Sequence, residues 1–271
     1  MMRSLWTAAS GMISQQTNVD TIANNLANIN TTGYKKETAQ FKSLLYQTIQ
    51  KKSYDSEGEE KPIGIQVGLG VRNSAIASQY TQGILEETGN DFDFALQGDG
   101  FFTIQLEDGS YAYTRNGSFQ MTIGVNGLTM CDAAGRPVCD TNGNPIVLDP
   151  QYTAADVAID TSGRLMYPDE NNNLQYIGVQ MGIAQFNNPA GLEKISDSLL
   201  VTTGASGEAR MEATDPALKS STVHQKYVEA SNVSAVDEMV NLIVAQRAYE
   251  MNSKVITASD TMLQQANNLR S

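Results

Sequence analysis

The chain has 271 residues, which is enough for about two domains. Its 18 Lys and Arg residues are outnumbered by 30 Asp and Glu residues, and the net charge of −12 disfavours nucleic-acid phosphates and anionic lipid surfaces as partners. No apolar run approaches the roughly 20 residues that a membrane-spanning helix needs, so direct membrane insertion is not expected.

Residues 5–30 are predicted to form a long amphipathic helix. Apolar residues recur every seven positions, and a second set follows three positions further along, which is the spacing of a coiled-coil seam. The two sets are Leu5, Met12, Val19 and Leu26, and then Ala8, Gln15, Ile22 and Ile29. Thr31, Thr32 and Gly33 favour the end of the helix. Taken alone, the pattern also fits a helix that packs on a globular core of the chain's own.

The first residues are only weakly similar to a secretory signal peptide. Their apolar stretch is interrupted by Thr7, Ser10 and Gly11, and the seven-residue repeat continues well past any cleavage point. We therefore expect these residues to belong to the mature protein. If the protein works outside the cytoplasm, another export route must carry it.

Residues 1–33 are thus assigned to the N-terminal helix, and residues 34–62 are predicted to form a linker or extended arm. Residues 50–62 are mostly polar and charged, and such a segment cannot bury an apolar core. Residues 63–201 are predicted to form the central domain, which opens with a strand of alternating apolar residues. These residues are Ile63, Ile65, Val67, Leu69 and Val71.

The central domain is predicted to consist of antiparallel β-hairpins, because turn dipeptides recur through it. They are Asp99-Gly100, Asp108-Gly109, Asn116-Gly117, Asn126-Gly127, Asn142-Gly143 and Ser162-Gly163. Residues 202–230 are predicted to form a return linker. Cys131 and Cys139 either form a disulfide across a hairpin or stay unpaired, since two cysteines define no disulfide framework.

Residues 231–271 are predicted to form the second long helix. Ser234 can cap its first turn, where Asp237 and Glu238 complement the helix dipole. Two apolar stripes follow, one stepping by threes and fours and one at a spacing of seven. The first comprises Val244, Ala248, Met251, Val255, Ala258, Met262 and Leu269, and the second Leu242, Tyr249, Ile256 and Leu263. One stripe can pack on the N-terminal helix, and the other is predicted to need another subunit.

The residues give no support to an enzyme, a cofactor or a metal site. His224 is the only histidine, which removes serine and cysteine triads and most zinc sites. Residues 140–144 are similar to a calcium loop, but the glycine comes early and Gln151 replaces the bidentate acid, so a turn is expected. Asp91 and Asp93 are expected on one solvated face of a strand.

These elements predict an α+β, multi-domain protein with paired N- and C-terminal coiled-coil-like helices and a central antiparallel β-rich domain. Such a layout brings the chain ends together and is typical of proteins that polymerise through their helices. The predicted seam and polymer interface comprises Leu5, Met12, Val19, Ile22, Leu26, Ile29, Leu242, Val244, Tyr249, Met251, Val255, Ile256, Met262, Leu263 and Leu269.

Several strings, in one order along the chain, resemble the bacterial flagellar rod and hook proteins. The N-terminal signature comprises Asn24, Asn25, Leu26, Ala27, Asn28, Thr32 and Gly33. Further similar segments are residues 44–48, 66–71, 95–102, 113–119, 188–192 and 229–254. The sequence departs from the family at residues 226–229, where a glycine-containing stretch is more usual, and at Asn116, where aspartate is common.

The resemblance implies a structural axial protein of the flagellar basal body. Residues 3–6, residues 44–48 and the chain length are most similar to distal-rod subunits. A hollow rod that acts as a drive shaft between motor and hook is therefore implied. A proximal rod or hook-type subunit is the alternative within the family. A β-rich surface binding module on a helical stalk is the alternative from a different class.

The resemblance also implies partners and a location. Copies of the chain would form a helical homopolymer that meets proximal rod and hook proteins, with ring proteins as further candidates around it. Export through the flagellar type III apparatus, without a cleaved signal peptide, would place the protein in the basal body outside the cytoplasm. Free subunits are expected to keep both ends largely disordered until assembly, because neither apolar stripe is covered in an isolated chain.

Overall fold

The computed structural model describes residues 2–50, 65–124, 127–149, 152, 156–169, 173–196 and 198–269. The chain forms two compact units, each assembled from separate stretches of sequence. Unit 1 comprises Met1–Ala27, Glu37–Ser78 and Ser234–Ser271, and unit 2 comprises Asn28–Lys36 and Gln79–Val233. The predicted α+β class, with a helix near each end and an antiparallel β-rich centre, is confirmed. The coiled-coil geometry of the helices stays a prediction.

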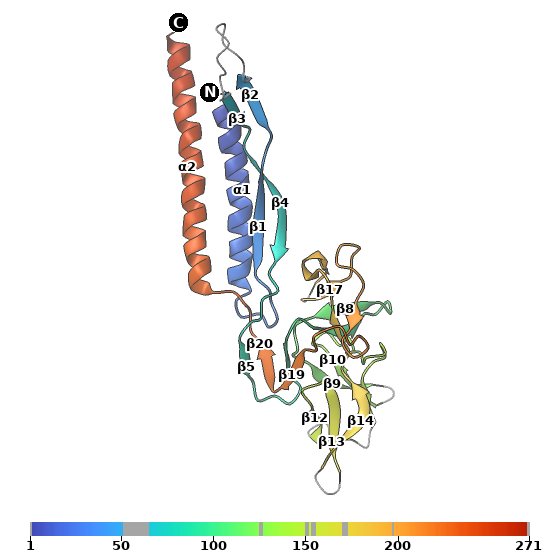
Figure 1. Cartoon of the computed structure of the whole chain (residues 1–271). Coiled ribbons are helices and arrows are strands. Elements are labelled where there is room, and N and C mark those ends of the chain that lie inside the picture. The colour runs from blue at the N-terminus through green and yellow to red at the C-terminus, as the bar shows by residue number, and fades with distance from the viewer. Residues whose placement is uncertain are drawn as a thin grey trace. The chain divides into compact units, whose positions relative to one another are not determined.

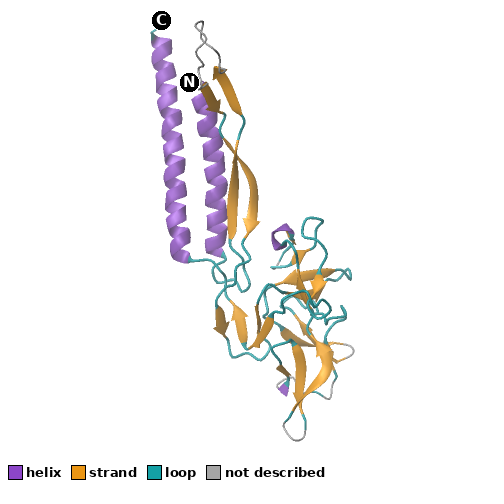
Figure 2. Ribbon diagram, viewed as in Figure 1, coloured by secondary structure: helices purple, strands orange, loops and turns teal. Residues whose placement is uncertain are grey.

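Unit 1 is built on two long antiparallel helices that lie side by side (Figures 1 and 2). A two-stranded antiparallel ribbon packs on the first helix, which therefore contacts the second helix and the ribbon. The elements are helix α1 (Met2–Ala27), strands β1 (Glu37–Ser43), β2 (Tyr46–Gln50), β3 (Ile65–Gly68) and β4 (Val71–Ser78), and helix α2 (Ala235–Asn268). Neither helix, over its described residues, is long and apolar enough to cross a membrane.

Helix α1 ends at Ala27, earlier than predicted. Just beyond it, Asn28 Oδ1 accepts a hydrogen bond from the Thr31 hydroxyl at 3.1 Å, and the Asn28 carbonyl accepts one from the Thr31 N–H at 3.2 Å. Asn and Thr side chains compete in this way with helical hydrogen bonds. The predicted seam residue Ile29 therefore lies outside the helix, in unit 2.

The predicted cap of helix α2 is confirmed. Ser234 has an extended backbone conformation, and its Oγ accepts a hydrogen bond from the Asp237 N–H at 3.5 Å. Asp237 and Glu238 occupy the first turn, where their charge complements the partial positive charge of the helix N-terminus. The start of this helix was therefore predictable from local residues.

The first part of the segment predicted as a linker or extended arm, residues 34–62, contains the strands β1 and β2. Their partners β4 and β3 come from the stretch predicted to open the central domain, so all four strands belong to unit 1. Strand β1 escaped prediction because Phe41 is its only large apolar residue, which leaves no alternating pattern. Residues 51–64, which hold most of the charged arm, lie outside the described residues.

Unit 2 consists mainly of short antiparallel strands. Its largest sheet has the strand order β16-β17-β8-β7-β15-β18, and two three-stranded sheets have the orders β11-β10-β9 and β12-β13-β14. The first elements are β5 (Leu85–Glu87), β6 (Phe94–Gln97), β7 (Phe101–Gln105), β8 (Tyr111–Thr114), β9 (Gln120–Gly124), β10 (Gly127–Cys131), β11 (Val147–Leu148) and β12 (Ala158–Ile159). The remaining elements are β13 (Arg164–Pro168), β14 (Leu174–Gln180), β15 (Ile183–Gln185), the 3-10 helix η2 (Pro189–Gly191), β16 (Glu193–Lys194), β17 (Leu200–Val201), β18 (Arg210–Met211), β19 (Thr222–Gln225) and β20 (Tyr227–Glu229).

Two apolar clusters lie on opposite faces of strand β7. Phe102 belongs to the first, and its ring centroid lies 5.2 Å from that of Phe119. Phe101 belongs to the second, which also holds Tyr113 and Phe186 with their ring centroids 4.8 Å apart. Successive strand residues point to opposite faces, so the adjacent phenylalanines anchor one cluster each. Strand β7 is therefore buried on both sides at the centre of unit 2.

Three hairpin turns of unit 2 share the pattern Asp-x-x-Gly. In each, the glycine has a positive φ and donates its N–H to the carbonyl oxygen of the aspartate three residues before it. These glycines are Gly135, Gly143 and Gly163. Glycine suits the position because a Cβ atom would be strained there. The second of these turns is the one expected at residues 140–144.

Cys131 and Cys139 are both free and buried, so the disulfide alternative is not realised in this fold. Burial raises the pKa of the Cys139 thiol to about 11, and burial likewise raises the pKa of Cys131. Because the thiolate is the reactive form, both side chains act as small apolar residues of the core.

The return linker predicted for residues 202–230 contains three short strands: β18 pairs with β15, β19 with β6, and β20 with β5. Lys226 stands between β19 and β20 with a φ of +69°. Its N–H donates to the Asp93 carbonyl at 2.7 Å, and its own carbonyl accepts from the Thr88 N–H at 2.9 Å. The chain thus changes its pairing partner at a residue held in the left-handed region, which strains any side chain with a Cβ.

We predict that Lys226→Gly stabilises unit 2 by roughly 0.5–1 kcal/mol, because glycine adopts a positive φ without strain. The exposed pair between Lys226 Nζ and Asp91 Oδ1, 2.9 Å apart, would be lost at little cost. Urea unfolding of the full chain, followed by circular dichroism, measures the change. Lys219→Gly is the matched control and should be neutral or destabilising. If Lys226→Gly destabilises the chain more than Lys219→Gly does, the backbone of Lys226 is not strained.

Candidate functional site

The residues predicted to form the helical seam fall into three classes of exposure. Ile22 is buried. The partly buried members are Leu5, Met12, Val19, Leu26, Leu242, Ile256 and Leu263, together with Ile29 of unit 2. The exposed members are Val244, Tyr249, Met251, Val255, Met262 and Leu269. The stripe of α2 spaced by seven thus lies mostly toward the interior of unit 1, and most of the other stripe lies on its surface.

Helices α1 and α2 meet along small and polar side chains that the predicted seam did not include. The hydroxyl oxygens of Ser4 and Ser259 lie 3.4 Å apart. At Gly11, a Cβ atom would come within 2.9 Å of the Asn252 amide nitrogen, so the helices approach closely there. Small side chains let helix backbones approach, but they bury little apolar surface.

A third contact between the helices is made by Asn25. Its amide nitrogen donates to a carboxylate oxygen of Glu238 at 3.0 Å and to the Glu37 carbonyl at 2.8 Å. Its amide oxygen accepts from the Glu37 N–H at 2.9 Å. Asn25 and Glu238 are both almost fully buried, so this one amide joins α1, α2 and the start of β1.

The three contacts follow a single antiparallel register with a step of seven residues. The pairs are Ser4 with Ser259, Gly11 with Asn252, and Asn25 with Glu238. The same register places Asn18 opposite Ala245, which is buried. The predicted seam missed this line because it followed large apolar residues only. The signal that would have found it is the same spacing of seven, read on small and polar residues.

Both helices leave large apolar side chains on the surface of unit 1. On α1, Trp6 is 72% exposed and Ile13 is 65% exposed, seven residues apart. On α2, the exposed apolar residues include Val236, Met239, Val240, Ile243, Val244, Met251, Val255 and Met262. A shallow apolar groove of about 390 Å³ also runs beside Val19 and Tyr249. Large exposed apolar side chains that recur along a helix in this way are typical of a protein interface.

A buried ion cluster joins three distant segments of unit 2. Glu229 Oε1 lies 2.6 Å from Lys35 Nζ, and Glu229 Oε2 lies 3.2 Å from a guanidinium nitrogen of Arg115. The Gly83 N–H donates to Glu229 Oε1 at 2.8 Å, and Lys35 Nζ also donates to the Thr81 carbonyl at 2.8 Å. All three charged side chains are almost fully buried. Removing one partner would leave uncompensated charge in the interior.

The electrostatics of this cluster follow from its burial. Desolvation lowers the pKa values of Lys35 and Arg115, and the nearby Glu229 carboxylate opposes both shifts. The guanidinium of Arg115 also lies over the Phe101 ring, 5.2 Å from its centroid. The carboxylate and the aromatic face therefore hold the two cations in an interior that would otherwise disfavour their charge.

Several signature residues of the N-terminal segment lie next to the Asn25 hydrogen-bond network or the Glu229 ion cluster. Thr32 donates its hydroxyl hydrogen to Asn116 Oδ1 at 2.8 Å. The Gly33 N–H donates to the Glu229 carbonyl at 2.8 Å, and its φ is +69°. A Cβ atom on Gly33 would come within 2.6 Å of the Arg115 carbonyl carbon, so only glycine fits. Of the remaining signature residues, Asn24 donates to Glu37, Asn28 accepts from Thr31, Leu26 is partly buried and Ala27 is exposed.

The residues weighed for catalysis have structural contacts instead. The expectation that Asp93 lies on a solvated face is wrong, because it is buried and accepts hydrogen bonds from the hydroxyls of Thr88 and Ser118. His224 contacts Gln97 Oε1 at 3.0 Å. Among the described residues, no group of three or more His, Cys, Asp or Glu side chains is placed to hold a metal ion.

Three family models match separate parts of the chain. The model described as "Flagella basal body rod protein" matches residues 5–35, which hold most of α1 and the N-terminal signature. The "Flagellar hook protein FlgE/F/G D1 domain" matches residues 95–167 of unit 2. The "Flagellar basal body rod FlgEFG protein C-terminal" matches residues 224–269, from β19 through α2. The matches thus include all three members of the buried ion cluster, Lys35, Arg115 and Glu229.

Curated relatives are similar over the whole chain. The flagellar basal-body rod protein FlgG of Borreliella burgdorferi is 42% identical over 100% of this chain and 99% of its own. FlgG of Caulobacter vibrioides is 42% identical over 100% of both chains. The flagellar hook-basal body complex protein FlhP of Bacillus subtilis is 30% identical, again over 100% of both chains.

We predict that Glu229→Gln destabilises unit 2 by about 3–5 kcal/mol, since it leaves Lys35 and Arg115 without their buried carboxylate. Denaturant unfolding of the full chain, followed by circular dichroism, measures this loss. Glu86→Gln is the matched control, because Glu86 is exposed on β5 and pairs with β20 one residue away from Glu229. The control should change stability by less than about 0.5 kcal/mol. Equal stability of both variants would rule out an energetic role for the cluster.

Proposed function

This chain belongs to the flagellar basal-body rod FlgEFG family, and we propose that its copies polymerise through unit 1 into the distal rod, a drive shaft between motor and hook. The protein's role is structural and needs no catalytic site or cofactor. The observation that carries the proposal is the exposed apolar surface on α1 and α2, which a single copy leaves uncovered.

The chemistry of the helix pair supports assembly between copies. Within one copy the helices meet through side chains such as Ser4, Gly11 and Asn252, which bury little apolar area. Many of the larger apolar side chains face outward, and each contributes roughly 1.5–3 kcal/mol once it is fully buried. A neighbouring copy that covers them would stabilise the pair more than the contacts within one copy do. This supports free subunits whose helices are weakly ordered before assembly.

The distribution of charge also favours unit 1 as the packing surface. Its stretches contain ten acidic and nine basic residues, for a net charge of −1. The stretches of unit 2 contain 20 acidic and nine basic residues, for a net charge of −11. Like charges on neighbouring copies repel, so close packing costs least in the near-neutral unit 1.

The proposed partners and location follow from the family. We propose that the rod meets proximal rod and hook proteins at its ends, where related helices could continue the same packing. Ring proteins around the rod and the flagellar type III export apparatus are further proposed partners. Export through that apparatus would place the protein in the basal body outside the cytoplasm.

Two other readings of the sequence are less well supported. A hook-type or proximal rod subunit shares the family, but the full-length relatives described above are named as rod or hook-basal body proteins, and two of them as FlgG. A β-rich binding module on a helical stalk would explain the two units, but not the family matches at both ends of the chain.

We predict that Val255→Asp blocks assembly and motility while unit 2 stays folded. Val255 is 44% exposed in the free subunit, so the carboxylate is tolerated there. Once a neighbour covers the stripe, the same carboxylate would be an unpaired buried charge. Motility assays and electron microscopy of basal bodies measure the effect, and circular dichroism checks the fold.

Thr257→Asp is the matched control, because Thr257 is exposed on the same helix and outside the apolar stripe. It adds the same charge two residues away, so rods of normal length are expected. Normal rods in the Val255→Asp strain would refute assembly through this stripe. Loss of rods in both strains would mean that a negative charge added at either position blocks assembly, and the stripe would have no special role.

A further inference from the structure

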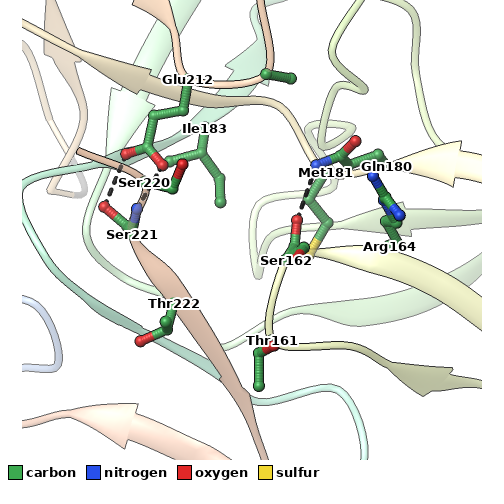
Figure 3. A pocket seen from close by; sticks show the side chains of 11 residues that line it. Thr161, Ser162, Arg164, Gln180, Met181, Ile183, Glu212, Ser220, Ser221 and Thr222 are labelled. Carbon is green, nitrogen blue, oxygen red and sulfur yellow. Dashed lines mark hydrogen bonds between the residues drawn. The ribbon is translucent and has the colours of Figure 1, made fainter. Parts of the chain in front are cut away.

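Unit 2 contains a polar pocket of about 310 Å³ that the proposed function does not use (Figure 3). It lies between the turn that joins β12 to β13, the end of β14 and the chain that leads into β19. Most of its polar groups are hydroxyls and amides, with one carboxylate and one guanidinium. In Figure 3, Ser162, Arg164 and Gln180 line one side, and Glu212, Ser220 and Ser221 line the other.

The carboxylate in this pocket, that of Glu212, already accepts hydrogen bonds from the protein's own donors. Glu212 Oε1 accepts from the Ser221 hydroxyl and from the Gln185 amide, each at 2.7 Å. Glu212 Oε2 accepts from the Ser221 N–H at 2.6 Å. Glu212 therefore fixes the wall of the pocket, and among the described residues it forms no ion pair with the guanidinium of Arg164.

Arg164, by contrast, keeps its hydrogen-bonding capacity. Its guanidinium lies over the Tyr176 ring, 5.7 Å from the centroid, which orients the planar group. Within the described part of the chain it has no hydrogen bond or ion pair, and the hydroxyls of Ser162 and Ser220 likewise have none. The pocket thus presents a fixed cationic fork and two free hydroxyl donors.

We propose that this pocket binds the carboxylate of an acidic side chain on a second copy of the chain. A guanidinium fork matches the two oxygens of a carboxylate, and hydroxyls add neutral donors to the same group. Each copy carries 20 acidic residues in unit 2 against nine basic ones, so a neighbour in a polymer offers carboxylates at fixed positions. The proposal rests on the polymerisation proposed above.

The first test compares Arg164→Gln with Lys219→Gln in the full-length chain. Both remove one positive charge from unit 2, but the exposed Lys219 side chain is not part of the pocket. Arg164→Gln should raise the critical concentration for assembly about tenfold or more relative to the control, with unchanged circular dichroism. Equal critical concentrations of the two variants would overturn the site. Failure of the wild-type chain to assemble at all would instead overturn the proposed function on which the site depends.

The second test identifies the bound group by zero-length crosslinking of Arg164→Lys assemblies. A carbodiimide activates a carboxyl group, the introduced amine displaces the resulting urea, and an amide bond remains. Assemblies made from mixed unlabelled and isotope-labelled subunits should yield a peptide that links position 164 of one copy to an Asp or Glu of another. Wild-type assemblies lack the amine and are the control. A link found only within one copy, or no link at position 164, would overturn the proposal.

Discussion

The fold of unit 2 depends on the buried carboxylate of Glu229. This carboxylate binds Lys35 from the segment after α1 and Arg115 from the centre of the chain. Because each cation would be costly to bury alone, the three segments are stable in this interior only together. The cluster therefore closes unit 2 across nearly 200 positions of sequence, and it fixes the stretches that lead out of α1 and into α2.

Unit 1 is held together by different interactions. Its two helices are joined by a seven-residue register of small and polar contacts, with the Asn25 amide bound to Glu238 at one end and Ser4 facing Ser259 toward the other. Such contacts specify register more than they stabilise, since little apolar area is removed from water. Many large apolar residues, among them Trp6, Ile13 and Met251, are instead exposed. A chain built this way keeps its strongest helical contacts for neighbouring copies, which fits a subunit that becomes fully ordered in a polymer.

Much of this could be predicted from sequence, where the signal is local. The seven-residue spacing, the Ser234 cap and the Asp-Gly and Asn-Gly turns predicted the helices and the β-rich centre. The features that the sequence did not predict depend on tertiary pairing. The ribbon strand β1 has a single large apolar residue, and its pairing with β4 leaves no mark in its sequence. Lys226 carries no local signal for a positive φ, and neither Lys35 nor Glu229 reveals by spacing that it pairs with the other.

The central claim is that the helices of unit 1 become fully ordered only against neighbouring copies, whereas unit 2 folds within one copy. Amide hydrogen exchange, followed by mass spectrometry on free subunits and on assembled rods, tests this most directly. The account predicts rapid exchange in α1 and α2 of the free subunit, strong protection of both helices in the rod, and equal protection of strands β7 and β8 in both states. Helices that are as protected as β7 in the free subunit, or that gain no protection in the rod, would contradict it.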